Sequence, residues 1–203
     1  MGVRKAMGNM ASSLSTWGLR HLAHRPAANM PGKIALKIDP RIIAESMDKI
    51  TEGSIVVVGT NGKTTITNMI ADALERQGKS IACNRTGANL AYGVATTLLQ
   101  TKGTVEWGVF ESDELWLAHT LPQVQADYVL LLNLFRDQLD RCGEIDRVQD
   151  AIATALEQSP NTTLLYNADD PLCASIAARV PNMSIAFGID GATGTESDRI
   201  SDS

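Results

Sequence analysis

Apolar residues recur with a regular rhythm along most of this 203-residue chain. From about residue 51, short apolar segments alternate with longer amphipathic ones, which is typical of parallel strands joined by crossover helices. Four of the six apolar segments are rich in Val, Ile, Leu or aromatic residues and contain no charge, as strands covered on both faces require. The predicted strands span residues 55–58, 80–83, 105–110, 128–133, 163–166 and 184–187.

The segments between these strands have the spacing of helices. In residues 63–77, Ile66, Ile70 and Leu74 recur at every fourth position, and Gly78 follows as a C-terminal cap. Further helices are predicted at residues 90–100, 145–158 and 171–178. The pattern therefore predicts an α/β fold, with a mostly parallel sheet and flanking helices.

The two ends of the chain depart from this rhythm. A helix is predicted to begin near Ser12, and Pro31-Gly32 is expected to form a turn after it. Asp39 and Pro40 are expected to start a helix that runs to about residue 50. The last residues are rich in Gly, Thr, Ser and Asp, a linker composition. The predicted parts are an N-terminal helical and extended segment at 1–50, a central domain at 51–190 and a polar tail at 191–203.

Charge is unevenly distributed along the chain. Residues 1–50 carry eight basic and three acidic side chains, whereas residues 101–203 carry six and 17. The net charge of −5 and the 4% aromatic content argue against a nucleic-acid-binding protein, which needs a basic surface and usually stacking rings. The basic start either packs on its own domain or touches an anionic membrane surface. It lacks the unbroken apolar segment of a secretion signal, and the longest apolar run, at 128–132, is too short to cross a bilayer, so a cytoplasmic location is expected.

The cysteines are Cys83, Cys142 and Cys173. Their odd number and wide spacing predict neither a disulfide framework nor a zinc site. We expect them to be small core residues of a protein in a reducing compartment.

The strongest chemical signal is a glycine-bearing turn that follows the strand at 55–58 and leads into a helix, the context of a phosphate-binding loop. Its glycines let successive N–H groups point inward, and the start of the helix adds positive potential. Lys63 is expected to reach the β- and γ-phosphates, and the Thr64 hydroxyl to bind Mg²⁺. The predicted nucleotide-binding residues of the loop are Gly59, Thr60, Asn61, Gly62, Lys63, Thr64 and Thr65.

This loop is shorter than the common form of the motif, whose first glycine would fall at Val57. The Gly-Thr-Asn-Gly-Lys-Thr form resembles the Mur ligase superfamily, ATP-dependent enzymes that join amino acids to peptidoglycan precursors, and the related folylpolyglutamate synthases. The resemblance implies that residues 51–190 are the central ATP-binding domain of a ligase that uses ATP and Mg²⁺.

Further segments resemble the family in the same order along the chain. Asn89 ends a Thr-Gly-Ala-Asn segment, whose asparagine in the family approaches the terminal phosphate. Glu111 directly follows the strand predicted at 105–110, and the resemblance implies that it binds Mg²⁺, with Asp113 and Glu114 as alternatives. The implied catalytic residues are Lys63 and Glu111, the implied metal ligands are Thr64 and Glu111, and the further nucleotide contacts are Asn89, Asn133 and Asp137.

The sequence also departs from the family pattern. Gln138 stands where many members have a histidine, and no lysine follows Lys102, so the carbamylated lysine of many Mur ligases has no counterpart. The Asn-Ala-Asp-Asp-Pro segment at 167–171 is either a turn that caps the next helix or a part of the nucleotide site.

These departures narrow the choice within the family. The segments at 31–40, 85–90, 111–114 and 133–141 together resemble the ligase subunits of lipid II isoglutaminyl synthases. The resemblance implies that ATP activates the α-carboxyl group of D-glutamate in lipid II, and that ammonia from a GatD glutaminase subunit then displaces phosphate. It also implies a zinc-binding segment and a C-terminal domain downstream, with Zn²⁺ expected only there. We therefore expect a fragment that binds nucleotide phosphate. The alternatives are another ligase, such as a folylpolyglutamate synthase, or a non-catalytic nucleotide-binding module.

Overall fold

The computed structural model describes residues 30–135 and 144–189. Its strands form one sheet in the order β2-β3-β1-β4-β5-β6, and every neighbouring pair is parallel. The predicted α/β fold with a mostly parallel sheet is confirmed. The strands are β1 (Ile50–Val58), β2 (Ile81–Cys83), β3 (Val105–Glu111), β4 (Tyr128–Leu131), β5 (Thr163–Asn167) and β6 (Ser184–Phe187).

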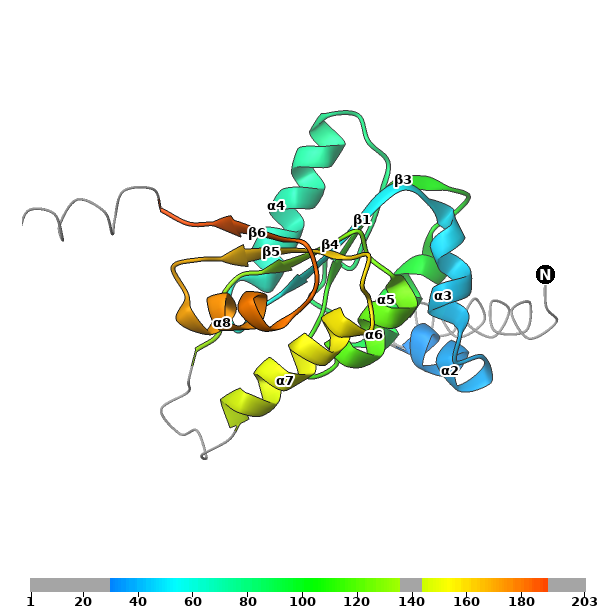
Figure 1. The fold of residues 1–203 in the computed structure, drawn as a ribbon. Helices are drawn as coiled ribbons and strands as arrows, with labels where there is room; N and C mark the ends of the chain where they lie inside the picture. The colour runs from blue at the N-terminus through cyan, green and yellow to red at the C-terminus, as the bar shows by residue number, and fades with distance from the viewer. Residues whose placement is uncertain (1–29, 136–143, 190–203) are drawn as a thin grey trace, which may run out of the picture.

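The helices lie on both sides of this sheet, with α4 above it and α5 to α8 below it in Figure 1. The chain moves one way along the sheet from β1 to β2 and the other way in each later step, so right-handed crossovers place α4 on the opposite face from the rest. The helices are α2 (Met30–Ile38), α3 (Ile42–Ser46), the 3₁₀ helix η1 (Met47–Lys49), α4 (Lys63–Arg76), α5 (Ala91–Gln100), α6 (Leu117–Val124), α7 (Glu144–Glu157) and α8 (Pro171–Arg179).

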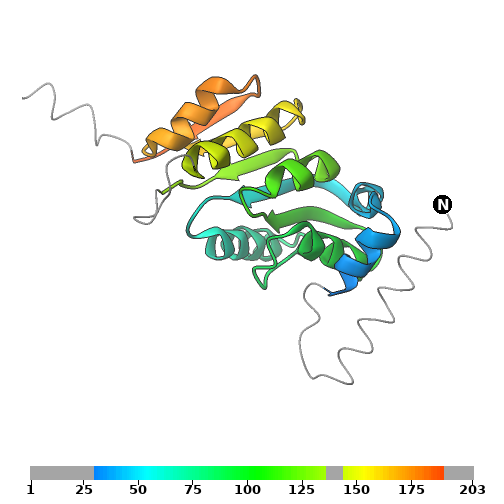
Figure 2. The same ribbon diagram turned by 90° about the horizontal axis from the view of Figure 1, so that it is seen from below.

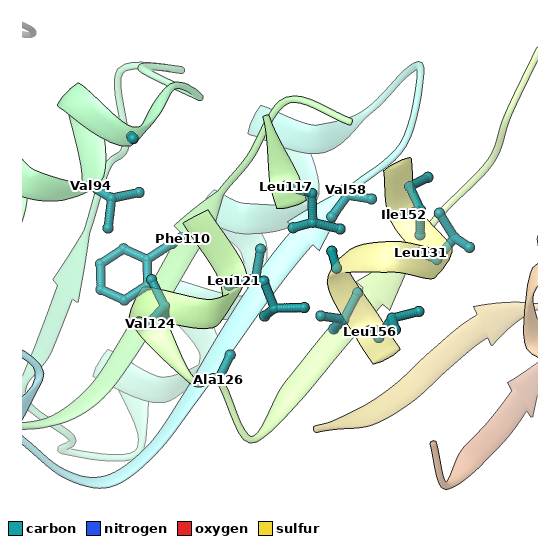
Figure 3. Packing of buried hydrophobic residues seen from close by; sticks show 14 of the residues in the cluster. Val58, Val94, Phe110, Leu117, Leu121, Val124, Ala126, Leu131, Ile152 and Leu156 are labelled. Atoms are coloured by element: carbon teal, nitrogen blue, oxygen red, sulfur yellow. The ribbon is translucent and has the colours of Figure 1, made fainter. Parts of the chain in front are cut away.

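The main hydrophobic core lies between the sheet and helices α5 to α8. Val56, Val129 and Leu164 are neighbours across β1, β4 and β5, and all three are fully buried in this core. Figure 3 shows the ring of Phe110, from β3, between Val94 and Val124 of the covering helices. Figure 2 shows α6, α7 and α8 side by side across this face.

The predicted turn at Pro31-Gly32 is wrong, because both residues belong to helix α2. Proline is tolerated in a first helical turn, where its missing N–H has no intrahelical partner. Gly32 allows α2 to approach α5 closely: a Cβ there would lie 2.0 Å from the Tyr92 carbonyl oxygen. The Gly32 N–H also donates to the Thr96 hydroxyl at 2.9 Å. The glycine is needed for helix packing rather than for a turn.

The helix predicted from Asp39 to about residue 50 is also too long. Asp39 accepts a hydrogen bond from the Arg41 N–H at 3.1 Å, and the helix then runs only from Ile42 to Ser46. The α-helix is followed directly by the 3₁₀ helix η1, and strand β1 already begins at Ile50. Lys49 donates to the carbonyl groups of Leu98 and Thr101, which fixes this junction at the end of α5.

Helix α6 has no counterpart among the predicted elements. It contains Pro122, and a proline inside an apolar segment normally argues against a helix interior. Here the proline lies in the second half of a helix of eight residues, whose Leu117 and Leu121 are fully buried. The helix predicted near Ser12 lies outside the residues that the structure describes.

Candidate functional site

The loop between β1 and α4 has backbone angles that favour glycine. Gly59 has a φ of 144° and Gly62 a φ of 84°, both in the left-handed region. A Cβ at Gly59 would also lie 3.0 Å from the Asn133 carbonyl oxygen. Glycine at position 59 is thus required both by the backbone angle and by the neighbouring chain.

Asn133, just beyond β4, holds this loop from the side. Its side-chain oxygen accepts a hydrogen bond from the Asn61 N–H at 2.9 Å, and its amide group donates to the Asn61 carbonyl at 3.0 Å. Its own carbonyl accepts from the Thr60 N–H at 2.8 Å. These three bonds fix the loop backbone relative to β4. The predicted residues Thr60, Asn61 and Asn133 therefore lie together.

Lys63 begins helix α4 and folds back over the loop. Its ammonium donates to the Gly59 carbonyl at 2.5 Å and to a Glu114 carboxylate oxygen at 3.1 Å. Both side chains of this ion pair are only 13% exposed. A cation is therefore held at the mouth of the loop, where the N–H groups at the start of α4 also favour an anion.

Thr64 and Glu111 meet beside this cation. The Thr64 hydroxyl donates to the Glu111 carboxylate at 2.7 Å, although the two residues come from α4 and β3. Glu111 is 3% exposed, so its carboxylate is almost fully removed from water. They meet because β3 lies next to β1 in the sheet, and both strands end at the same edge.

Asn84, which the sequence analysis missed, fixes the backbone of Glu111. Its side-chain oxygen accepts from the Glu111 N–H at 2.8 Å, and its amide donates to the Glu111 carbonyl at 2.9 Å. Asn84 is buried and directly follows the short strand β2. The signal that could have found it is the one used for Glu111: a polar residue at the carboxyl end of a predicted strand.

The segment that carries Asn89 borders the same place. A Cβ on Gly87 would lie 3.2 Å from the Thr64 hydroxyl and 3.8 Å from the Glu111 carboxylate. The Asn89 carbonyl accepts a hydrogen bond from the Asp113 N–H at 2.8 Å. The structure thus gathers the loop, Asn89, Glu111 and Asn133 at one edge of the sheet. Thr65 lies in the exposed first turn of α4, and Asp137 lies outside the residues that the structure describes.

The alternative metal ligands have other partners here. The Asp113 carboxylate accepts from the backbone N–H groups of Leu115 and Trp116, at 3.1 and 3.3 Å, and so shapes the turn before α6. Glu114 pairs with Lys63. Of the two carboxylates, only Glu114 contacts the loop.

The segment at 167–171 acts as a helix cap. One oxygen of Asp170 accepts from the N–H groups of Leu172 and Cys173, at the start of α8. The other accepts from the Leu134 N–H at 2.7 Å, and the Asn167 amide donates to the Leu132 carbonyl at 3.0 Å. Of the two interpretations of this segment, the structure favours the capping turn. That turn also positions the chain that carries Asn133.

Cysteine does not contribute to this site in the described residues. Burial raises the pKa of the Cys83 thiol to about 11 and that of the Cys173 thiol to about 12, so both stay protonated at neutral pH. Residues 30–135 and 144–189 contain no group of three or more His, Cys, Asp or Glu side chains placed to hold a metal. In the same ranges, none of the helices combines the length and the apolar character that a bilayer span requires.

The arrangement offers three things that a bound polyphosphate needs. It has a glycine-bearing loop at a helix N-terminus, a lysine at the mouth of that loop, and a hydroxyl next to a buried carboxylate. Backbone N–H groups and an ammonium bind phosphate oxygens, whereas hydroxyl and carboxylate oxygens suit a hard cation such as Mg²⁺.

Comparison with protein families and with individual proteins gives a consistent result. Residues 57–202 match the family described as Mur ligase middle domain. The chain is 34% identical over 193 residues to the Streptococcus pneumoniae protein named lipid II isoglutaminyl synthase (glutamine-hydrolyzing) subunit MurT, covering 94% of this chain and 42% of that protein. It is 36% identical over 152 residues to the Staphylococcus aureus protein of the same name, covering 73% and 34%. The chain thus spans less than half the length of these relatives.

Solved structures share the fold at lower identity. MurF from Acinetobacter baumannii superposes with a TM-score of 0.66 at 22% identity, covering 78% of this chain and 35% of that one. MurF ligase from Thermotoga maritima in complex with ADP superposes with a TM-score of 0.64 at 21% identity, covering 79% and 37%.

Proposed function

The chain belongs to the Mur ligase family, and we propose that residues 51–190 form the ATP-binding domain of a ligase that amidates a peptidoglycan precursor. The reaction converts the α-carboxyl group of D-glutamate in lipid II to an amide, with ammonia supplied by a GatD glutaminase subunit. Support for this branch of the family comes from the relatives in Streptococcus pneumoniae and Staphylococcus aureus, whose names describe a subunit of a glutamine-hydrolysing lipid II isoglutaminyl synthase.

The observation that carries the proposal is the pairing of two contacts at one edge of the sheet. Lys63 lies over the phosphate loop, and Thr64 donates to the buried carboxylate of Glu111 at 2.7 Å. A loop that bound only a small anion would not require the second contact. A nucleotide that carries its own divalent cation requires both.

The oxygens of Thr64 and Glu111 fit Mg²⁺, because a carboxylate that is 3% exposed needs a positive partner and a hard cation prefers oxygen. Thr64 and Glu111 would hold the ion. When bound there, Mg²⁺ supplies positive charge that offsets the charge of the phosphoryl group during transfer.

The chain's own part in the reaction is to bind and orient ATP. Lys63 and the loop N–H groups bind phosphate oxygens, and Asn133 keeps the loop in the required shape. A carboxylate oxygen of the acceptor attacks the γ-phosphorus in line and releases ADP, giving an acyl phosphate. The nitrogen of ammonia then attacks the acyl carbon and forms the C–N bond. The C–O bond to phosphate breaks, phosphate leaves with that electron pair, and the surplus proton on nitrogen passes to solvent.

One experiment tests this function against a second candidate. A relative in Koribacter versatilis, 30% identical over 134 residues and covering 66% of this chain and 28% of that protein, is named UDP-N-acetylmuramoylalanine--D-glutamate ligase. Such an enzyme would add an amino acid rather than ammonia. The ligase extended to the length of its relatives should be incubated with Mg-ATP, glutamine, the glutaminase subunit and lipid II, or with a nucleotide-linked precursor and D-glutamate.

We expect ADP release that depends on lipid II and glutamine, with the mass change of an amidated carboxyl group in the product. The Lys63→Ala variant should release no ADP above background. ADP release that depends instead on D-glutamate would contradict the amidation and support the second candidate. The 203-residue chain alone is expected to bind ADP without completing the reaction.

A further inference from the structure

Glu114 and Lys63 form an ion pair inside the phosphate loop region, and the proposed function uses only the lysine. The Lys63 Nζ and the Glu114 Oε1 lie 3.1 Å apart, and each side chain is 13% exposed. A pair with this little exposure is screened less by water and salt than a surface pair. The same ammonium is bonded to the Gly59 carbonyl at 2.5 Å. Lys63 is therefore held by the protein's own oxygens at the place where phosphate oxygens would bind.

We infer that Glu114 is a displaceable counter-ion for Lys63, a positioning residue that holds the ammonium until a nucleotide phosphate replaces it. This inference rests on the proposed nucleotide site. A polyphosphate brings several negative charges to the mouth of the loop, and it competes with a single carboxylate for the ammonium. The exchange sets the affinity of the site, because the ion pair must break whenever a nucleotide binds.

The backbone beside Glu114 is held in place, so its side chain is the part that moves. The Asp113 N–H donates to the Asn89 carbonyl at 2.8 Å, and the Asp113 carboxylate accepts from the next turn at Leu115 and Trp116. A new side-chain rotamer of Glu114 releases Lys63 without disturbing that turn. The device is therefore a side-chain exchange and needs no loop opening.

Charge repulsion adds to this competition. Glu114 and Glu111 both lie beside the loop, and Glu111 has the Thr64 hydroxyl as a partner and is the proposed ligand of Mg²⁺. When the ion pair with Lys63 is broken, the Glu114 carboxylate has no cation beside it, and its negative charge repels the incoming phosphates. Removing that charge removes both the competing ion pair and the repulsion, so the two effects have the same sign.

The test compares nucleotide binding by the Glu114→Gln variant and by a matched control. Glu106→Gln serves as the control, because Glu106 also pairs with a lysine, Lys79, at 2.9 Å, and it lies near the opposite end of strand β3. Both variants lose one negative charge. Binding of ADP to the 203-residue chain is measured by titration calorimetry, once with EDTA and no metal and once with excess Mg²⁺.

We expect Glu114→Gln to bind ADP about tenfold more tightly than the wild type in EDTA, and Glu106→Gln to bind it as the wild type does. Glu114→Asp, which keeps the charge, should stay within about threefold of the wild type. Thermal unfolding of each variant confirms that it is folded before it is titrated.

Unchanged or weaker binding of ADP by Glu114→Gln in EDTA overturns the inference. Unchanged affinity in EDTA together with weaker binding in Mg²⁺ also overturns it and makes Glu114 a metal ligand. A different result refutes the proposed function itself: the folded wild type binds no ADP under either condition. The counter-ion role of Glu114 is then refuted as well.

Discussion

The two faces of the sheet are covered to different extents. On the face of α5 to α8, the aligned residues Val56, Val129 and Leu164 are all fully buried. On the face of α4, the next row begins with Val57, which is also fully buried, but it ends at Ile185, which is 46% exposed. Coverage of this second face therefore fades from the centre of the sheet toward β6.

This difference in coverage shows that the candidate site lies at the well-covered part of the sheet. Helix α4 covers the sheet over β1, β2 and β3, and the phosphate loop and Glu111 lie at the ends of β1 and β3. The site thus rests on strands that are covered on both faces. The β6 region instead exposes large apolar side chains, namely Met183, Ile185, Phe187 and Ile189.

Truncating one apolar residue on each face tests whether the two faces are covered to different extents. Leu164→Ala on the covered face should lower the free energy of unfolding by about 2 to 5 kcal/mol, because it leaves a cavity in a packed core. Ile185→Ala on the open face should lower it by less than about 1 kcal/mol. Urea denaturation measures both. Equal losses would mean that the open face is covered in solution.

A second variant tests the link between α8 and the site. Asp170→Ala removes the cap of α8 and leaves the Leu134 N–H without its partner. The expected loss is about 2 kcal/mol of unfolding free energy, with ADP affinity of the folded protein changed less than about threefold. Asp170→Asn should recover part of the stability. A large loss of ADP affinity with full stability would instead place Asp170 in the nucleotide site.

The smallest expected effect is a pH dependence away from the site. The Ser80 N–H, and then Lys79, lower the pKa of Glu106 from the usual 4.5 to about 2. A carboxylate with a lowered pKa stabilises the folded state above about pH 4.5, and this contribution is lost as the pH falls toward 2.

Glu106→Gln lacks that contribution at every pH. Urea denaturation at pH 7 and pH 3 should therefore show the wild type losing more stability than the variant between the two values. A parallel decline in both proteins would argue against the Ser80 and Lys79 contacts as the cause.

Elements whose pattern is local were predictable from the sequence. The strand predicted at 184–187 agrees with β6 at both ends, and the helix predicted from residue 63 begins there in the structure. The α2 and α6 helices were not predictable, because each contains a proline and each is stabilised by packing against distant elements. Tertiary contacts overrode the local signals at Pro31 and Pro122.

The candidate site likewise has residues that the sequence predicts and contacts that only the fold determines. The phosphate loop is predictable because its glycines and Lys63 all lie within residues 59–63, and Glu111 is marked as a polar residue at the end of a predicted strand. The contacts of Asn84 and Glu114 depend on β3 lying between β1 and β2, and this order of strands is not encoded in any short segment. Which oxygen Lys63 contacts is likewise decided only by the fold.

The most direct measurement of the central claim is ADP binding to the 203-residue chain with and without Lys63. Titration calorimetry in Mg²⁺ should give saturable binding to the wild type, and Lys63→Ala should bind at least about 100-fold more weakly, about 2.7 kcal/mol, while unfolding at nearly the same temperature. Equal affinity of the two folded proteins for ADP would contradict the account, because the nucleotide phosphates would then lie somewhere other than this loop.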